Sequence, residues 1–163
     1  MVTDSTRVGA EWVLLSYRLP REPSTPRIAV WRKLRRLGAA QVLDGLVALP
    51  LDSRNREQFE WLADEIVEAG GEASIWIAAL SSRRQERDLV TRMSEAIAAE
   101  YRSLIEDAER VRGTAAGARR RSLARLRREL RRIRARDYFP PPERDLAERA
   151  VEDLAVIVEE VAG

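Results

Sequence analysis

Residues 12–50 read WVLLSYRLPREPSTPRIAVWRKLRRLGAAQVLDGLVALP, and residues 51–79 continue LDSRNREQFEWLADEIVEAGGEASIWIAA. The opening run from Trp12 to Tyr17 is short, apolar and rich in strand formers, which indicates a buried strand. Three prolines then force a loop, and apolar side chains recur at helical spacing from residue 27 to 37, where Gly38 ends the helix. Two short strands follow at 40–43 and 46–49. Between them Asp44-Gly45 predicts a two-residue hairpin turn in which both positions take positive φ.

A second helix and a last strand complete this half of the chain. Asn55 and Gln58 approximate a capping box at the start of the helix, and Gly70-Gly71 ends it. Residues 72–79 read as a strand with Ile75 and Ile77 on one face and Ser74 and Trp76 on the other. The order predicts an α+β fold with a ferredoxin-like domain, in which both helices cover one face of a four-stranded antiparallel sheet. We expect a partner subunit or the later helices against the other face.

Everything after residue 80 reads as helix. The segment 83–112 carries a narrow apolar stripe from Val90 to Val111, and the segment 119–136 carries a second stripe, so the two predict an antiparallel helical hairpin. Prolines at 140–142 interrupt the pattern, and a final amphipathic helix spans 143–161 through Leu146, Leu154 and Val161. The predicted domains are therefore a ferredoxin-like domain at 12–80 and a helical region at 81–163.

Composition excludes several kinds of chemistry. The chain has no Cys and no His, which removes thiolate and imidazole chemistry, so we expect no metal and no cofactor. No apolar run approaches the roughly 18 residues of a membrane span, and residues 1–11 are polar without a signal peptide, so a cytoplasmic protein is expected. No catalytic pair of carboxylates stands out, which predicts a non-enzymatic protein.

Basic residues gather in the second hairpin helix. Ten arginines lie between Arg119 and Arg136, against a single acid, Glu129. Such a helix suits the phosphate backbone of nucleic acid, whereas the alternative is a solvated helix paired with acids of its neighbours, such as Glu100 and Asp107. The residues expected to position the backbone, without reading bases, are Arg119, Arg120, Arg121, Arg127, Arg128, Arg131 and Arg132.

A second basic group surrounds the end of the first strand and the start of the first helix. A loop that leads into a helix N-terminus can hold an oxyanion through free N–H groups and the helix dipole. The candidate anion-binding residues are Arg18, Arg21, Ser24, Thr25, Arg27 and Arg32. The alternative is an ordinary basic helix exterior, and no Gly-rich phosphate loop is present.

With these residues in view, the chain resembles the N-terminal region of the ChrB family, which is linked to chromate resistance. The resemblance rests on WVLLSYRLPREPS (12–24), VWRKL (30–34) with Gly38, DGLVALP (44–50), Phe59, WL (61–62), EAGGEA (68–73), EY (100–101) and RDYF (136–139). It implies a chromate-responsive transcriptional regulator or an accessory protein of chromate resistance, with chromate or another oxyanion and DNA as partners.

The predicted sheet is also similar to the Cas2-like ferredoxin fold of nucleases and phenylacetate-type repressors. Those nucleases place an acid at the end of the first strand, where this chain has Ser16-Tyr17-Arg18, so a metal-dependent nuclease is disfavoured. The leading hypothesis is a homodimeric, oxyanion-responsive regulator that touches nucleic acid through its Arg-rich helix. The alternatives are a structural or interaction module that pairs through the helical hairpin and, less favoured, a nuclease.

Overall fold

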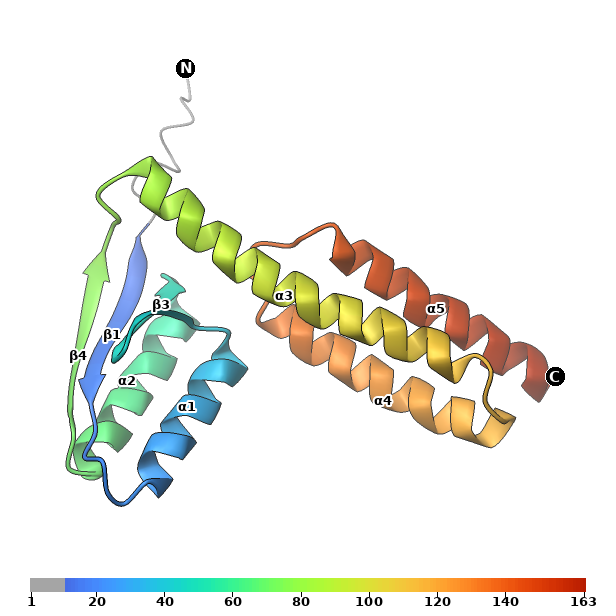
Figure 1. Ribbon diagram of the computed structural model, residues 1–163, viewed down its shortest axis with the longest axis horizontal. Helices are drawn as coiled ribbons and strands as arrows, with labels where there is room; N and C mark the ends of the chain where they lie inside the picture. Colours follow the sequence, from blue (N-terminus) through green and yellow to red (C-terminus); the bar gives the residue numbers. More distant parts are fainter. Residues whose placement is uncertain (1–10) are drawn as a thin grey trace. The chain divides into compact units, whose positions relative to one another are not determined.

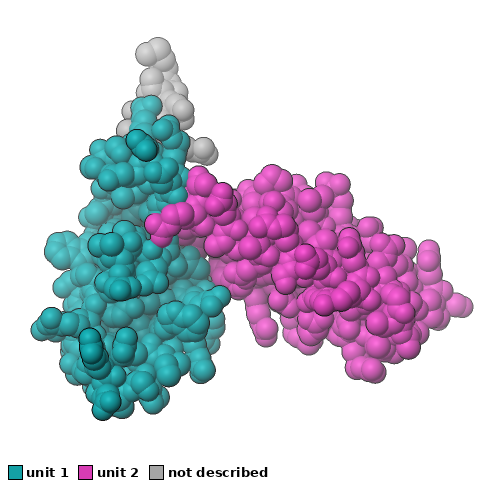
Figure 2. All heavy atoms as spheres, viewed as in Figure 1, with its two compact units in different colours: residues 1–89 teal, residues 90–163 magenta. Residues whose placement is uncertain are grey.

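The computed structural model describes residues 11–163, and the polar start at residues 1–10, where no signal peptide is predicted, lies outside the described residues. In chain order the elements are β1 (Trp12–Arg18), α1 (Thr25–Leu37), β2 (Ala40–Leu43), β3 (Leu46–Pro50), α2 (Ser53–Glu68), β4 (Glu72–Ala78), α3 (Arg83–Val111), α4 (Ala116–Ala135) and α5 (Glu143–Ala162) (Figure 1). The chain divides into two compact units, residues 1–89 and 90–163, coloured separately in Figure 2. The division falls within α3.

The first unit contains a four-stranded sheet with the strand order β2-β3-β1-β4. All neighbouring strands are antiparallel, and β1 pairs with β3 on one side and β4 on the other. Helices α1 and α2 lie on the same face of this sheet (Figure 1). The predicted ferredoxin-like α+β fold is therefore confirmed.

The core of this unit lies between the sheet and its two helices. Val13 and Leu15 of β1 are fully buried, and so are Phe59 and Ile66 of α2. Strand neighbours point to opposite faces, so Trp12, Leu14 and Ser16 belong to the other face. There Trp76 of β4 remains 56% exposed, and its indole Nε1 donates to the Ser16 hydroxyl at 2.8 Å.

Two local predictions about turns and caps are wrong. Gly45 has a φ of +76°, but no non-glycine residue in the described part of the chain has positive φ, so Asp44 does not. The two-residue connection itself is present, because Leu43 pairs with Leu46 across Asp44-Gly45, and the β2–β3 register shifts only further back, between Gln41 and Leu43. Gly45 is nevertheless required, because a Cβ there would lie 2.5 Å from the Tyr17 carbonyl oxygen.

The cap of α2 lies three residues earlier than predicted. Asp52 is the N-cap, and its Oδ1 accepts the Asn55 backbone N–H at 2.7 Å. Asn55 is buried, and its side-chain Nδ2 donates to the Pro50 carbonyl oxygen at 2.9 Å. An Asp cap satisfies an N–H of the first turn as well as an Asn cap would, so spacing alone did not distinguish the two residues.

The second unit is built from three helices with one core. Tyr101, Leu104, Leu126, Ile133, Ala147 and Leu154 are at most 1% exposed, and they come from α3, α4 and α5. The predicted apolar stripes of the first two helices are buried, whereas the last helix is buried along only part of its predicted stripe. It buries Ala147, Val151, Leu154 and Ala155, whereas Leu146 and Val161 are exposed.

None of the helices in residues 11–163 has the length and apolar character that crossing a membrane requires.

Candidate functional site

Helix α4 separates its residues into a buried stripe and a charged exterior. Leu123, Leu126 and Ile133 are buried, because positions three, four and seven apart lie on one side of a helix. Arginine is the commonest residue on the remaining surface, and the helix has no acid in its first turn. The hydrophobic stripe therefore turns most of the guanidinium groups away from the core of the unit.

The arginines at the borders of α4 are paired with acids of the neighbouring helices. Arg125 lies 3.8 Å from Asp107 of α3 and 3.6 Å from Glu129 of its own helix. Just beyond the end of α4, Arg136 pairs with Glu100 of α3. On the other border, Arg134 lies 3.2 Å from Glu148 of α5. The expected pairing with neighbouring acids thus occurs, but it is confined to these borders.

The outer face of α4 is different. Six of the seven arginines predicted to contact a phosphate backbone are exposed, and none of the six has an ion pair within residues 11–163: Arg120, Arg121, Arg127, Arg128, Arg131 and Arg132. We call these six residues the arginine face. Their contact with nucleic acid stays a prediction.

Arg119, the seventh residue of that set, lies apart from the arginine face. At about 100° per residue it falls on the same side of α4 as Leu126, seven positions later. It is half-buried, and its guanidinium donates to the Arg112 carbonyl oxygen at 3.0 Å. Its Nε is buried and has no hydrogen-bond partner in the described part of the chain. Arg119 therefore closes the turn between α3 and α4.

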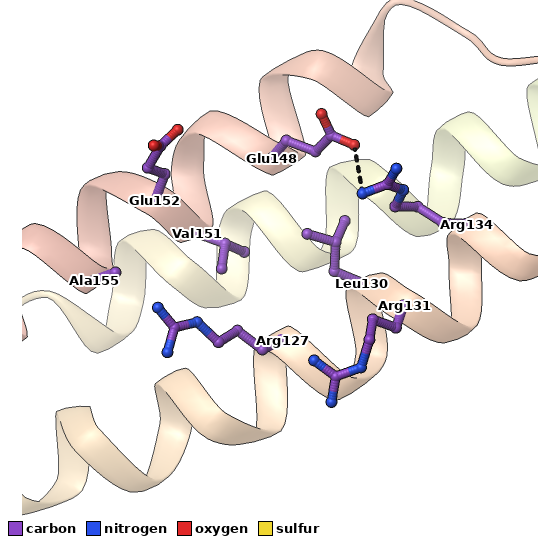
Figure 3. Close-up of a pocket in the computed structure, with 8 residues that line it drawn as sticks. All are labelled: Arg127, Leu130, Arg131, Arg134, Glu148, Val151, Glu152 and Ala155. Atoms are coloured by element: carbon purple, nitrogen blue, oxygen red, sulfur yellow. Dashed lines mark ion pairs between the residues drawn. The ribbon is translucent and has the colours of Figure 1, made fainter.

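A shallow groove runs between α4 and α5, with a volume of about 290 Å³. Its lining residues are Arg127, Leu130, Arg131, Arg134, Glu148, Val151, Glu152 and Ala155 (Figure 3). Figure 3 shows the Arg134–Glu148 ion pair across the groove, whereas the Glu152 carboxylate points away from α4. Neither Arg134 nor Glu148 is among the site residues predicted from the sequence. Only the packing of α5 on α4 makes them neighbours.

The candidate anion residues of the first unit are not gathered into one pocket. Arg18 donates to Glu72 of β4 at 2.6 Å, and both side chains are largely exposed. Arg27 lies near Tyr17: burial raises the pKa of the Tyr17 phenol, and the Arg27 guanidinium opposes that rise. Arg32 is five residues along α1 from Arg27, about 140° around the helix, so the two do not share a face. Arg21 is exposed in the loop before α1.

The start of α1 carries the remaining two members of that set. Ser24 is the N-cap residue, yet its side chain makes no capping hydrogen bond, and Thr25 and Pro26 form the first turn. Both hydroxyls belong to exposed residues. This end of the helix thus offers N–H groups and hydroxyls to solvent, with Arg27 in the same turn. Anion binding there remains a prediction.

Acidic residues in the described part of the chain form no group of three or more that would hold a metal ion. Asp44 accepts a hydrogen bond from the Gln41 side-chain amide at 3.1 Å, and Asp52 caps α2. Both of these carboxylates therefore have local structural partners.

The sequence motifs EY (100–101) and RDYF (136–139) meet inside the second unit. Tyr101 is fully buried, and its hydroxyl donates to Asp137 Oδ2 at 2.8 Å. Glu100 and Arg136, one residue before each, form an ion pair. Burial and the Asp137 hydrogen bond both raise the pKa of Tyr101. These contacts fasten α3 to the segment that follows α4.

Fold and surface together define a class: an α+β protein with a ferredoxin-like sheet and an arginine-rich helical unit. Residues 27–116 match the family model described as Protein ChrB, N-terminal, which is more than half of the chain, so the chain belongs to the ChrB family. The match ends at the first residue of α4.

A curated relative extends the similarity. Protein ChrB of Cupriavidus metallidurans is 27% identical to this chain over 133 residues, which is 79% of this chain and 40% of that protein. The chain thus spans well under half the length of this relative. No solved structure matches the chain.

Proposed function

We propose that this protein is a non-enzymatic regulatory protein of chromate resistance, and that the arginine face of α4 contacts the phosphate backbone of nucleic acid. Membership of the ChrB family supports the link to chromate resistance. The exposed arginines without ion pairs support the contact.

One observation carries the nucleic-acid contact: the neighbouring acids neutralise the borders of α4 but not its arginine face. By helical geometry the six arginines form two rows, the first with Arg120, Arg127 and Arg131 and the second with Arg121, Arg128 and Arg132. Ala124 and Ala135 lie between the rows, so no bulky side chain separates them. From Arg120 to Arg132 the rows extend over roughly 18 Å, at 1.5 Å per residue. Guanidinium groups so placed suit the oxygens of successive phosphates.

The salt dependence of binding tests this contact. Fluorescence anisotropy with a random-sequence DNA duplex should give a log–log slope of about −5 against salt concentration if all six arginines each neutralise a phosphate. The double substitution Arg128→Gln/Arg132→Gln should bring the slope closer to zero by about 1.8, because each lost contact is worth about 0.9. The matched control is Arg149→Gln, which removes an exposed arginine from α5 of the same unit. Absence of binding at low salt would end the proposal, and so would equal slopes for the double variant and the control.

We further propose that chromate or another oxyanion binds at the start of α1, next to Arg21 and Arg27. The unused Ser24 hydroxyl and the unmade cap support this, because an anion there would receive N–H groups that no side chain satisfies. Chromate or sulfate at millimolar concentration should raise the melting temperature. Arg27→Gln should abolish the rise, whereas Arg149→Gln should keep it. A melting temperature that does not respond to either anion would reject this site.

The two alternatives have less support. For the nuclease, Asp44 and Asp52 have structural partners in a turn and a cap, and no group of three or more acids among the described residues could hold a metal ion. The stripes of α3, α4 and α5 are buried against one another, so the hairpin has no free stripe for a second chain. We therefore propose that the homodimer expected from the sequence forms through another part of the molecule.

A further inference from the structure

The two edges of the sheet are built differently. Strand β2 is four residues long and has an irregular register, two features that keep an edge strand from pairing with other chains. Strand β4 is seven residues long and pairs with β1 in an unbroken register from Glu72 to Ala78. It contains no Pro or Lys, and its single charged residue, Glu72, stands at one end and is bound by Arg18. Within residues 11–163, edge β4 is thus long and regular and carries none of these protective features.

An edge strand of this kind leaves backbone groups unpaired. An antiparallel neighbour uses the N–H and C=O groups of every second residue, so the other half of the groups in β4 face away from β1. Among the described elements, β4 contacts chiefly β1 and α2, and Trp76 and Ile77 remain 56% and 46% exposed. Unpaired backbone groups beside exposed apolar side chains favour the addition of another strand at this edge.

We propose that β4 pairs antiparallel with β4 of a second copy of this chain, so that the two sheets join into one of eight strands. A two-fold axis normal to the sheet puts the helix-covered faces of both copies on the same side of the joined sheet. Each β4 residue therefore lies opposite a residue whose side chain is on the same side of the sheet. With the axis at Trp76, the two indoles lie opposite each other, and Ile75 meets Ile77 of the second copy. An axis at Ile75 would instead place Trp76 on Ser74 and Ile77 on Ala73. The register centred on Trp76 buries the two most exposed apolar side chains of the strand against apolar partners.

The charges at the two ends of β4 favour a second copy of this chain as the partner. Antiparallel pairing brings the Glu72 end of one β4 toward the other end of its partner, where Arg83 and Arg84 begin α3. A parallel arrangement would place the two Glu72 carboxylates side by side. The chain is therefore complementary to itself in this orientation. This inference deepens the homodimer of the proposed function and does not depend on its nucleic-acid contact.

Sedimentation velocity and light scattering of the full chain test the dimer. One strand pair is a small interface of the weak, transient class, so the concentration series should reach about 1 mM. The wild-type chain should move from 18.5 kDa toward twice that mass as its concentration rises. Trp76→Lys should shift the midpoint at least tenfold toward higher concentration, because two ammonium groups would then oppose each other across the axis. Trp61→Lys is the matched control, since Trp61 is equally exposed but lies on α2. It should dimerise like wild type.

Crosslinking tests the register and does not depend on whether Trp76→Lys folds. The chain has no native cysteine, so Trp76→Cys introduces a unique thiol. Directly opposite residues have Cα atoms about 4.5–5.5 Å apart, within the range that a disulfide spans. Oxidation should yield a covalent dimer of Trp76→Cys and none of Trp61→Cys. A wild-type chain that stays monomeric throughout the series overturns the inference, as does crosslinking of both variants alike. Salt-dependent DNA binding by that monomer would leave the nucleic-acid proposal standing.

Discussion

Replacing Tyr101 by Phe deletes one oxygen atom from the centre of the helical unit. The phenol is fully buried, and its hydroxyl is a donor to Asp137 Oδ2 at 2.8 Å. The second carboxylate oxygen, Oδ1, is buried without a hydrogen-bond partner among the described residues. In the variant, neither carboxylate oxygen of Asp137 would have a hydrogen-bond partner among the described residues.

The size of the effect follows from this geometry. A hydrogen bond to a charged group contributes about 1.5–3 kcal/mol, and most of that is lost when the remaining group stays in place. Asp137 is only half-buried, so water can reach part of it, and we expect a loss of about 2 kcal/mol in the free energy of unfolding. Tyr17→Phe is the matched control, because this half-buried tyrosine lies in the sheet and should lose less than about 0.5 kcal/mol.

Urea unfolding followed by two probes measures the loss. All four tryptophans, at 12, 31, 61 and 76, lie in the first unit, so their fluorescence reports on the sheet. Far-UV circular dichroism is dominated by the long helices α3, α4 and α5. Tyr101→Phe should lower the midpoint of the dichroism transition more than that of the fluorescence transition. If Tyr101→Phe and Tyr17→Phe lower the free energy of unfolding equally, the buried hydrogen bond does not stabilise the helical unit.

The same residue predicts a pH dependence. Because its pKa is raised in the folded state from the ordinary value of 10.0, Tyr101 keeps its proton while an unfolded tyrosine loses it. The folded state then binds more protons, so stability is fully present below pH 10 and falls as pH rises above it. The slope from one such group approaches 1.4 kcal/mol per pH unit. Above pH 10, the free energy of unfolding of Tyr101→Phe should fall less steeply with pH than that of the wild type. Equal slopes for the two proteins would contradict a raised pKa at Tyr101.

Two further predictions concern the sheet unit. Asp52→Ala removes the oxygen that caps α2 and should cost about 1 kcal/mol, measured by urea unfolding with tryptophan fluorescence, whereas an unchanged midpoint would place the cap elsewhere. Gly45→Ala forces a Cβ to within 2.5 Å of the Tyr17 carbonyl at positive φ and should cost more than about 2 kcal/mol. Gly117→Ala, in the first turn of α4, adds a Cβ that meets only the flexible Arg121 guanidinium at 3.7 Å, so it should be neutral or stabilising by up to about 1 kcal/mol; similar losses for both substitutions would refute the steric argument.

The candidate sites were predictable to different depths. A count of arginines and the spacing of Leu123, Leu126 and Ile133 located the arginine-rich helix and its outward direction. Neither could say which guanidinium groups would remain without ion pairs, because Asp107 and Glu148 come from other helices. Arg119 is a different case: it belongs to the same run of charge, but its helical phase, seven residues before Leu126, could have been read from the sequence and would have placed it against the core. The sequence of β4 has almost no charge, which favours pairing with another strand. That feature indicates an interface only once the strand order shows that β4 is an outer strand.

What the sequence determined by itself was local: where each strand and helix runs, that glycine must stand at 38 and 45, and that the fold is a ferredoxin-like α+β arrangement. Backbone propensity and hydrophobic period act between near neighbours in the chain, so they can be read without coordinates. Only the tertiary structure decided the cap at Asp52, the face of α5 that packs through Ala147 and Ala155, and the border arginines that acids neutralise. Those outcomes depend on contacts between residues that are far apart in the sequence. The hydrophobic pattern leaves several helix faces nearly equal, and the size and charge of the neighbouring element decide which face packs.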